Sequence, residues 1–319
     1  MNDGLVVALL TSGVLYGTPI LLAALGELLA ERSGVINLGV EGMMLMGAVV
    51  GFWACQGVGG PGPVALGVAL VAAMIAGAAM ALIHAFMVVS LRVNQIVSGL
   101  ALTILGGAVG LSSYLAQVWN LGGQKADHVF RSVDFLGLGD LPLIGPLLFD
   151  QNVMVYLSWV LVIAVAAYLY RTRLGLHLRA VGEDPAAADA MGIGVTRYRY
   201  AHTIAGGAFA GLGGAFFVFA ITPNWSDGVT AGSGWIALAL VIFAFWRPGW
   251  VLVGAYLFGV VTSLGFNLQA RGVDLPPELF GALPYLMTIV VLVAVSGAWA
   301  KGRLNPPQAL GVPYSREEH

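Results

Sequence analysis

The chain has 319 residues, of which 59% are hydrophobic and 9% are charged, and its net charge is −2. Soluble domains carry about 25% charged residues, so this composition excludes an ordinary soluble protein and indicates a polytopic membrane protein. The near-neutral charge gives no indication of nucleic-acid binding. Cys55 is the single cysteine, which excludes an intrachain disulfide and a cysteine-based metal site.

Nine apolar runs follow one another along the chain, and about 20 residues cross a bilayer core as a helix. The runs are Leu5–Leu25, Ser33–Gln56, Pro63–Leu91, Val93–Ala116, Val153–Tyr170, Ala201–Ile221, Ser233–Trp246, Val251–Leu268 and Pro284–Ala300. The seventh run spans only ~21 Å at ~1.5 Å per residue, so it either begins earlier, near Asp227, or is a half-helix. We predict an all-α membrane protein with about nine transmembrane helices, in the range of about eight to ten.

The basic residues predict the orientation of these helices, because Lys and Arg are enriched in cytoplasmic loops. If the loop at 171–200 is cytoplasmic, eleven of the 14 basic residues fall on the cytoplasmic side. They are Arg32, Arg92, Arg171, Arg173, Arg179, Arg197, Arg199, Arg247, Lys301, Arg303 and Arg316. The other three, Lys125, Arg131 and Arg271, fall outside. The N-terminus is therefore predicted outside and the C-terminus inside.

We expect a single transmembrane domain at 1–300 and a cytoplasmic tail at 301–319. The domain contains one long external segment, 117–151, which is suited to a surface-lying helix and loops. This segment either closes a vestibule, receives a partner or is a plain connector. Small residues recur every four positions in the third run, at Ala73, Gly77 and Ala81, and Gly207 and Gly211 do so in the sixth. Such spacing predicts close packing of helices in a membrane.

The loop at 171–200 carries eight of the 30 charged side chains and contains the marks of a short, bounded helix. Asp184 is suited to the N-cap, Pro185 to the first helical position and Gly192 to the C-terminal end. A helix of two turns is unstable alone in water, because the cost of nucleation exceeds the gain from so few bonds. We therefore expect this helix to dock onto a partner.

Glu41 lies near the predicted midplane of the second run, where a carboxylate is costly unless it faces a cavity or a partner. Asn37 lies one turn earlier on the same face, and His84 lies at a similar depth in the next run. Two interpretations stay open. Glu41 either locks the structure through the backbone of the Gly39–Gly42 turn or contacts a solute, and a Glu41–His84 pair is compatible with the sequence.

Other polar residues near the ends of the runs are further candidates for the path of a solute. Asn94 and Ser98 open the fourth run, where Asn94 is suited to a helix cap as well as to a ligand. Asn267 ends the eighth run and is suited to a gate or to the membrane interface. Trp225 precedes the seventh run and is suited to the aromatic belt at the interface or to a ligand.

Motifs for ATP hydrolysis and other catalysis are missing, since the chain contains no GxxxxGK[ST], HExxH or GxSxG. The two lysines, Lys125 and Lys301, do not follow glycine-rich loops. We predict that the chain is not an enzyme and holds no cofactor or metal of its own. Glu41 is the single carboxylate expected at depth, whereas an ion-coupled carrier needs a denser set.

Four segments, in order along the chain, carry a family resemblance. They are ERSGVINLGVEGMMLMGA at 31–48, NQIVSGLALTIL at 94–105, RAVGEDPAAADAMGI at 179–193 and AGSGWIALALVIFAFWRP at 231–248. Together they resemble a permease of an ATP-binding-cassette (ABC) importer. The similarity is to the ribose and branched-chain amino acid permease superfamily, and most closely to its nucleoside-type branch.

This resemblance implies a multi-pass subunit of the bacterial cytoplasmic (inner) membrane that has no ATPase activity. Its implied partners are a second, homologous permease subunit, cytoplasmic ABC ATPase subunits that bind ATP and Mg, and an external solute-binding protein. The segment that matches the family's coupling helix, which sits in a groove of the ATPase, comprises Glu183, Asp184, Pro185, Ala186, Ala187, Asp189, Ala190, Met191 and Gly192. The expected solute is small and neutral, foremost a nucleoside, because the path lacks the charges that an ionic solute requires.

Three alternatives stay open. The first is an ABC permease for a sugar or a branched-chain amino acid. The second is an ion-coupled secondary carrier, which transport by the purified chain without ATP would favour. The third is a non-transporting membrane scaffold, which would bind neither an ATPase nor a solute. Co-purification with an ATPase that contains a Walker motif would favour the importer.

Overall fold

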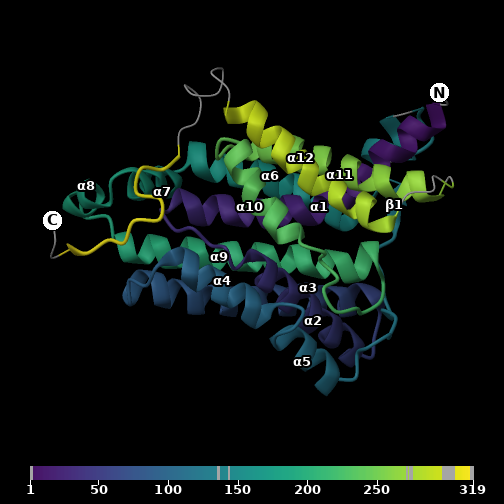
Figure 1. Cartoon of the computed structure of the whole chain (residues 1–319), viewed down its shortest axis with the longest axis horizontal. Coiled ribbons are helices and arrows are strands. Elements are labelled where there is room, and N and C mark those ends of the chain that lie inside the picture. Colours follow the sequence, from purple (N-terminus) through teal and green to yellow (C-terminus); the bar gives the residue numbers. More distant parts are fainter. Residues whose placement is uncertain are drawn as a thin grey trace.

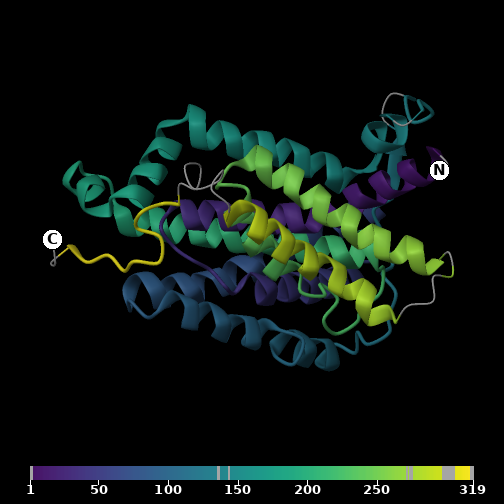
Figure 2. The same ribbon diagram turned by 45° about the horizontal axis from the view of Figure 1, so that its top comes forward.

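The helices of the protein run mainly along its long axis (Figures 1 and 2). The computed structural model describes residues 3–134, 137–142, 144–270, 272, 276–296 and 306–316. Helix α1 (Asp3–Arg32) begins at one end of the long axis, and α7 (Arg173–Glu183) and α8 (Pro185–Ala190) lie at the opposite end (Figure 1). The predicted outer and cytoplasmic segments therefore lie at opposite ends of the molecule.

The remaining elements follow in chain order. The other helices are α2 (Val40–Gly57), α3 (Gly62–Ala85), α4 (Gln95–Gly106), α5 (Leu111–Val118), α6 (Val153–Arg171), α9 (Val195–Phe216), α10 (Ser233–Phe243), α11 (Pro248–Ala270) and α12 (Pro277–Ser296). The π-helical turns are η1 (Phe86–Ser90), η2 (Gly145–Phe149) and η3 (Phe217–Ile221). Strands β1 (Ser132–Asp134) and β2 (Asp150–Asn152) pair antiparallel. The chain is thus mostly helical, as predicted, and this small ribbon, whose paired strands satisfy each other's backbone groups, lies mainly in the segment 117–151 that was predicted to be external.

Six helices in the described part of the chain are long and apolar enough to cross a membrane. They are Val6–Arg32, Gly62–Ser90, Gln95–Val118, Val153–Arg171, Val195–Ile221 and Pro248–Ala270. The other three predicted runs overlap α2, α10 and α12. Since α10 has 11 residues, it is the half-helix that the sequence left as one of two options. The count of nine crossings stays a prediction.

α1 continues beyond its predicted end at Leu25, and its last turns bury two carboxylates. Glu27 accepts a hydrogen bond from the backbone N–H of Asn37 at 3.0 Å. Glu31 accepts one from the indole N–H of Trp246. These partners allow acidic residues to be buried, because each carboxylate has a donor in place of water.

α2 begins at Val40, not near Ser33 as predicted. Gly34 has a φ of 90°, in the left-handed region, which ends the helix that precedes it. The Asn37 carboxamide oxygen accepts a hydrogen bond from the N–H of Gly39 at 3.0 Å. Residues 33–39 therefore form a non-helical link inside the protein, which we call the 33–39 link.

Other helices also begin or end at residues that differ from those predicted. The fourth run is divided into α4 and α5, and at the break the carbonyl oxygen of Gly107 accepts from the Ser112 hydroxyl at 2.8 Å and from the Gly110 N–H at 2.9 Å. α9 begins at Val195, so Arg197 and Arg199 of the predicted loop lie in its first turns. α12 begins earlier than the ninth run, whose last four residues lie outside the described part of the chain.

α9 is central to the packing and lies against α1, α2 and α3. Glycines allow these helices to approach closely. A methyl group added to Gly77 of α3 would lie 2.0 Å from the carbonyl oxygen of Gly207 on α9. One added to Gly214 of α9 would lie 1.8 Å from the carbonyl oxygen of Met44 on α2. The small residues predicted for helix packing therefore form the crossings of α9 with α3 and α2.

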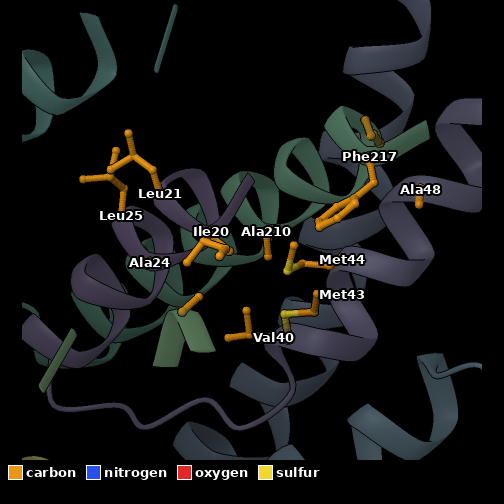
Figure 3. Packing of buried hydrophobic residues seen from close by; sticks show 14 of the residues in the cluster. Ile20, Leu21, Ala24, Leu25, Val40, Met43, Met44, Ala48, Ala210 and Phe217 are labelled. Atoms are coloured by element: carbon orange, nitrogen blue, oxygen red, sulfur yellow. The ribbon is translucent and has the colours of Figure 1, made fainter. Parts of the chain in front are cut away.

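The hydrophobic core surrounds α1 on every side from residue 17 to its end at Arg32. Leu21, Leu22 and Leu25 of this helix have no exposed surface, as expected for a helix that is apolar all round. Met43 and Met44 of α2 reach toward it in Figure 3. Flexible methionine side chains fill irregular gaps in such cores. This part of α1 is therefore buried within the protein, whereas residues 6–12 are exposed or half-buried.

We predict that Gly77→Ala destabilises the protein by about 1–3 kcal/mol, because the added methyl group overpacks the α3–α9 crossing. Gly67 on the same helix is the matched control, since no atom lies within 4 Å of its added methyl group. Gly67→Ala should be neutral or stabilise by up to ~1 kcal/mol through helix propensity. Thermal unfolding of the purified protein in detergent measures both. Equal melting temperatures for the two variants would contradict this crossing.

Candidate functional site

A cavity of about 370 Å³ lies between α1, η3, α10, α11 and α12. Its lining residues are Tyr16, Ile20, Phe217, Ile221, Thr222, Val229, Ala231, Ser233, Ile236, Thr262, Gly265, Phe266, Gln269, Phe280, Gly281, Pro284 and Tyr285. Cavities of about 300–1,000 Å³ are typical of small-molecule sites. On the orientation predicted from the basic residues, these segments belong to the outer half of the protein.

The cavity walls are aromatic and uncharged. The rings of Tyr16 and Phe266 stack with their centroids 5.1 Å apart and an interplanar angle of 22°. Phe217, Phe280 and Tyr285 contribute further rings. The described lining contains no Asp, Glu, Lys, Arg or His, and its polar side chains are Thr222, Ser233, Thr262, Gln269 and the phenols of Tyr16 and Tyr285. Such walls suit a neutral solute with a flat or apolar face and a few hydroxyl groups.

The loop before α10 forms one wall of the cavity and has a left-handed backbone. Ala231 and Gly232 have φ values of 48° and 79°. A methyl group added to Gly232 would lie 2.1 Å from the hydroxyl oxygen of Tyr285, so glycine suits this position by both its φ and its size. The Tyr285 hydroxyl donates to the carbonyl oxygen of Ala231 at 3.0 Å. This bond fixes the loop to α12.

The carboxylate of Glu41 holds the same loop from the side of α2. It accepts hydrogen bonds from the Thr230 hydroxyl at 2.5 Å, the Gly232 N–H at 3.0 Å and the Gly234 N–H at 2.6 Å. α10 begins at Ser233, so these amides belong to its N-terminus. The first N–H groups of a helix have no partner within it, and its dipole favours a negative charge there. Glu41 therefore caps α10 from another helix.

Glu41 is bonded to backbone groups, as the lock interpretation requires, but at α10 and not at the place expected from the sequence. The carboxylate does not bond to the Gly39–Gly42 turn, and it forms no pair with His84. The ring nitrogens of His84 instead lie 2.9 Å from the Ser98 hydroxyl and 2.9 Å from the carbonyl oxygen of Ile36. Sequence spacing misleads here because residues 33–39 are not helical, which places Glu41 in the first turn of α2.

The 33–39 link is held by side chains from three helices. Besides the bond from His84, the carboxamide oxygen of Gln95 on α4 accepts a hydrogen bond from the N–H of Ile36 at 2.7 Å. Glu27 on α1 accepts from the N–H of Asn37. Backbone groups at membrane depth must find partners within the protein. These side chains supply them, so the link depends on polar residues that are far apart in the sequence.

The other predicted pathway residues have structural partners. Asn94 caps α4 by accepting from two backbone N–H groups, at 3.0 and 3.1 Å. Trp225 is buried beside Phe52, with ring centroids 6.3 Å apart. Asn267 donates to a backbone carbonyl one turn earlier at 2.9 Å. None of the predicted residues lines the described cavity: Asn37, Glu41, His84, Asn94, Ser98, Trp225 and Asn267.

The residues that do line the cavity are absent from the sequence-based prediction. Tyr16, Phe266 and Tyr285 are aromatic residues within apolar runs, so composition alone does not distinguish them from the hydrophobic core. The available signal is the stretch Gly228–Gly234, with three glycines just before a short apolar run. A helix interrupted in this way points to the binding site of many transporters.

Glu27 and Glu31 are also absent from the prediction, although they are buried carboxylates like Glu41. Both residues are buried and lie one turn apart on α1. Trp246, which donates to Glu31, accepts a hydrogen bond on its carbonyl oxygen from Arg32 at 2.9 Å. These bonds connect the end of α1 to the segment that follows α10.

α8 forms at the predicted position. Asp184 is its N-cap, and its carboxylate accepts a hydrogen bond from the N–H of Ala187 at 2.9 Å. Pro185 is the first helical residue, and Gly192 follows the helix with a φ of 80°. α7, which the sequence-based prediction lacks, immediately precedes it. Local capping residues alone are enough to set the limits of α8.

One face of α8 packs on the protein and the other is open. Ala188 is buried in a small apolar cluster with Val181 of α7. Ala187 and Ala190 are exposed, and Met191 just after the helix is 81% exposed. An exposed methionine beside small residues is a surface that a partner can cover with little steric hindrance.

Asp189, on the predicted contact face of α8, is engaged within the chain. Its carboxylate lies 2.9 Å from the guanidinium Nε of Arg316. Tyr314 lies beside it, and burial together with the Asp189 carboxylate raises the pKa of this phenol above its ordinary value. The C-terminal segment therefore contacts the helix that is predicted to dock onto a partner.

The C-terminal segment at 306–316 also contacts two other parts of this end of the protein. The N–H of Ala309 donates to the carbonyl oxygen of Gly182 on α7 at 2.9 Å. The N–H of Gly311 donates to the carbonyl oxygen of Gly34 at 3.1 Å. The segment thus joins α7 and α8 to the start of the 33–39 link.

Comparisons with known proteins all indicate the same family of transporter permeases. Residues 9–292 match the family described as "Branched-chain amino acid transport system / permease component". The chain is 41% identical to a protein of Haloferax volcanii named "Putative glucose ABC transporter permease protein", over 97% of this chain and 98% of the relative. It is 36% identical to the guanosine ABC transporter permease protein of Bacillus subtilis, over 94% of each chain. It is 35% identical to a nucleoside ABC transporter permease protein of Lactococcus lactis, over 96% of each, and a second protein so described in that organism also matches.

Proposed function

The chain belongs to the family of permease components of branched-chain amino acid transport systems, and we propose that it lines half of the path of a small neutral solute through an ABC importer. The six apolar helices and the similarity to ABC transporter permeases support this role. A second permease subunit would complete the path, as the two similar permeases of Lactococcus lactis suggest. Cytoplasmic ATPase subunits would bind ATP and Mg, and an external protein would deliver the solute.

A nucleoside is the solute that we propose, and the aromatic cavity carries this proposal. Stacking of one base on an aromatic side chain contributes about 1–3 kcal/mol, and Tyr16 and Phe266 offer ring faces in an uncharged site. The guanosine and nucleoside permeases among the relatives support the same class. A branched-chain amino acid fits less well, because its ammonium and carboxylate groups would find no charged partner in the described lining.

A neutral sugar is the second candidate. The observation that favours it is the 41% identity to the Haloferax volcanii protein, whose name refers to glucose. The hydroxyl groups of Thr222, Ser233 and Thr262 in the lining would serve a sugar and a ribose alike. The base distinguishes the two classes, because it gains most from the aromatic walls.

We predict that Phe266→Ala weakens nucleoside uptake about tenfold, because it removes one stacking surface from the cavity. Phe86→Ala is the matched control, since Phe86 and Phe266 are both 51% exposed and Phe86 lies outside the cavity lining. Uptake of labelled adenosine and glucose by the complete importer in proteoliposomes measures both variants. A loss of glucose uptake alone would favour the sugar as the solute. Equal uptake by the two variants would show that the cavity is not part of the solute path. Transport without ATP or partners would favour an ion-coupled carrier.

We further propose that the chain is a multi-pass protein of the bacterial cytoplasmic membrane with its N-terminus outside. The asymmetry of the basic residues supports this orientation. In a Cys55→Ala background, we predict that Ser226→Cys reacts with an impermeant thiol reagent applied from outside. Ala187→Cys should react only after permeabilisation, and both positions are exposed. The reverse labelling pattern would overturn the orientation.

α8 is the element that we propose to contact the ATPase. The proposed contact set is Glu183, Asp184, Pro185, Ala186, Ala187, Asp189, Ala190, Met191 and Gly192. A helix of six residues needs packing to be stable, and here the packing of Ala188 leaves the opposite face open. Closing of two such helices when the partner binds ATP would move the permease halves between outward and inward access.

We predict that Ala187→Arg and Ala190→Arg reduce recruitment of the ATPase or make ATP hydrolysis insensitive to the loaded solute-binding protein. The added side chains put bulk and charge at the open face of α8 without touching the membrane-spanning helices. Pull-down of the ATPase and solute-stimulated hydrolysis in nanodiscs measure the effect. Membrane insertion and pairing with the second permease should stay normal and serve as the control. Normal recruitment and stimulation in both variants would show that α8 is not the coupling element.

A further inference from the structure

The N-terminus of α10 faces the cavity on one side and Glu41 on the other. Ala231 and Ser233 line the cavity. The amides of Gly232 and Gly234, which alternate with them, donate to Glu41. The carboxylate itself is not part of the lining. Glu41 thus lies directly behind the wall that a solute would touch.

This arrangement decides the sign of the electric potential at that wall. The N-terminus of a helix carries about half a positive elementary charge and is by itself a site for phosphate or carboxylate groups. α10 has 11 residues, so its terminus has this character. A full negative charge on Glu41 more than offsets it, and the remaining charge at this wall is negative.

We propose that Glu41 determines solute specificity by making the cavity reject anions and accept uncharged solutes. The proposal rests on the function proposed above and names the residue that determines which solute charge the cavity accepts. Glu41 acts through the backbone of the α10 terminus, so it is a positioning residue that also sets the charge of the site. Its carboxylate also accepts hydrogen bonds from the N–H groups of Gly232 and Gly234, so these donors do not offset its charge elsewhere.

The charge of Glu41 is separable from its hydrogen bonds. An uncharged amide oxygen at the same place still accepts from the amides of α10, although more weakly than a carboxylate. Glu41→Gln therefore removes the charge and keeps part of the bonding. Thr230→Val is the matched control, because it removes the hydroxyl that donates to Glu41 and leaves the charge in place.

The test compares three solutes of similar shape and different charge. They are adenosine, adenosine-5′-carboxylic acid, which is an anion, and 5′-amino-5′-deoxyadenosine, which is a cation. Equilibrium dialysis measures their binding to the assembled permease–ATPase complex without the solute-binding protein, so selectivity reports on the permease. We expect the wild-type complex to bind adenosine at least about tenfold more tightly than the anion, and to bind the cation more tightly than the anion.

In Glu41→Gln the preference for adenosine over the anion should narrow about tenfold, whereas in Thr230→Val it should stay at the wild-type ratio. Equal binding of adenosine and the anion by the wild-type complex would overturn the proposal. So would an unchanged ratio in an assembled Glu41→Gln complex. If the Glu41→Gln complex does not assemble, the binding of the anion, the neutral solute and the cation to the wild-type complex still tests whether the cavity rejects anions.

A different result would contradict the proposal that the solute is a nucleoside. If the wild-type complex binds none of the three nucleosides, the nucleoside proposal is wrong, whereas the charge proposal is then decided with glucose and glucuronate. Tighter binding of glucose than of glucuronate in the wild type, with a narrower ratio in Glu41→Gln, would support it. Equal binding of the two would overturn it.

Discussion

Three hydrogen bonds, which the Glu41 carboxylate accepts from Thr230 in the loop before α10 and from Gly232 and Gly234 at its N-terminus, hold the interrupted part of the fold together. A helix that begins within a membrane protein exposes backbone N–H groups where water is scarce, and each must find an acceptor. Glu41 supplies acceptors from α2, while Tyr285 fixes the loop from α12. The half-helix and the cavity wall exist in this form because a buried charge and a helix end satisfy each other.

The tightly packed part of the protein and its cavity are built from different contacts. α9 meets α2 and α3 through glycines, where backbones touch and side chains have no room, as at Gly77 and Gly214. The cavity instead lies between α1 and the segments from η3 to α12, where rings such as Tyr16 and Phe266 form the walls. Backbone contact gives a rigid group of helices, whereas contacts between rings leave space for a solute.

A continuous set of contacts leads from α8 to the cavity. Asp189 of α8 pairs with the C-terminal segment, and Gly311 of that segment bonds to Gly34 at the start of the 33–39 link. The link leads into α2, whose first turn places Glu41 directly behind the wall of the cavity. α8 is therefore connected to the wall of the cavity through the C-terminal segment and the 33–39 link. Both ends of this path are held by charged groups. Substitutions that change the charge of these groups and conserve their size would therefore weaken the connection between α8 and the cavity.

The sequence by itself determined the class of the protein, the position of most helices and the limits of α8. These follow from local causes, because apolar runs are continuous along the chain and the caps at Asp184 and Asn94 act within three residues. The family was also legible, since its motifs are contiguous. Only the tertiary structure decided the extra turns of α1, the non-helical 33–39 link, the partners of Glu41 and the walls of the cavity. Glu41 and Gly234 are 193 residues apart, and no periodicity or spacing indicates which distant backbone a buried carboxylate will meet.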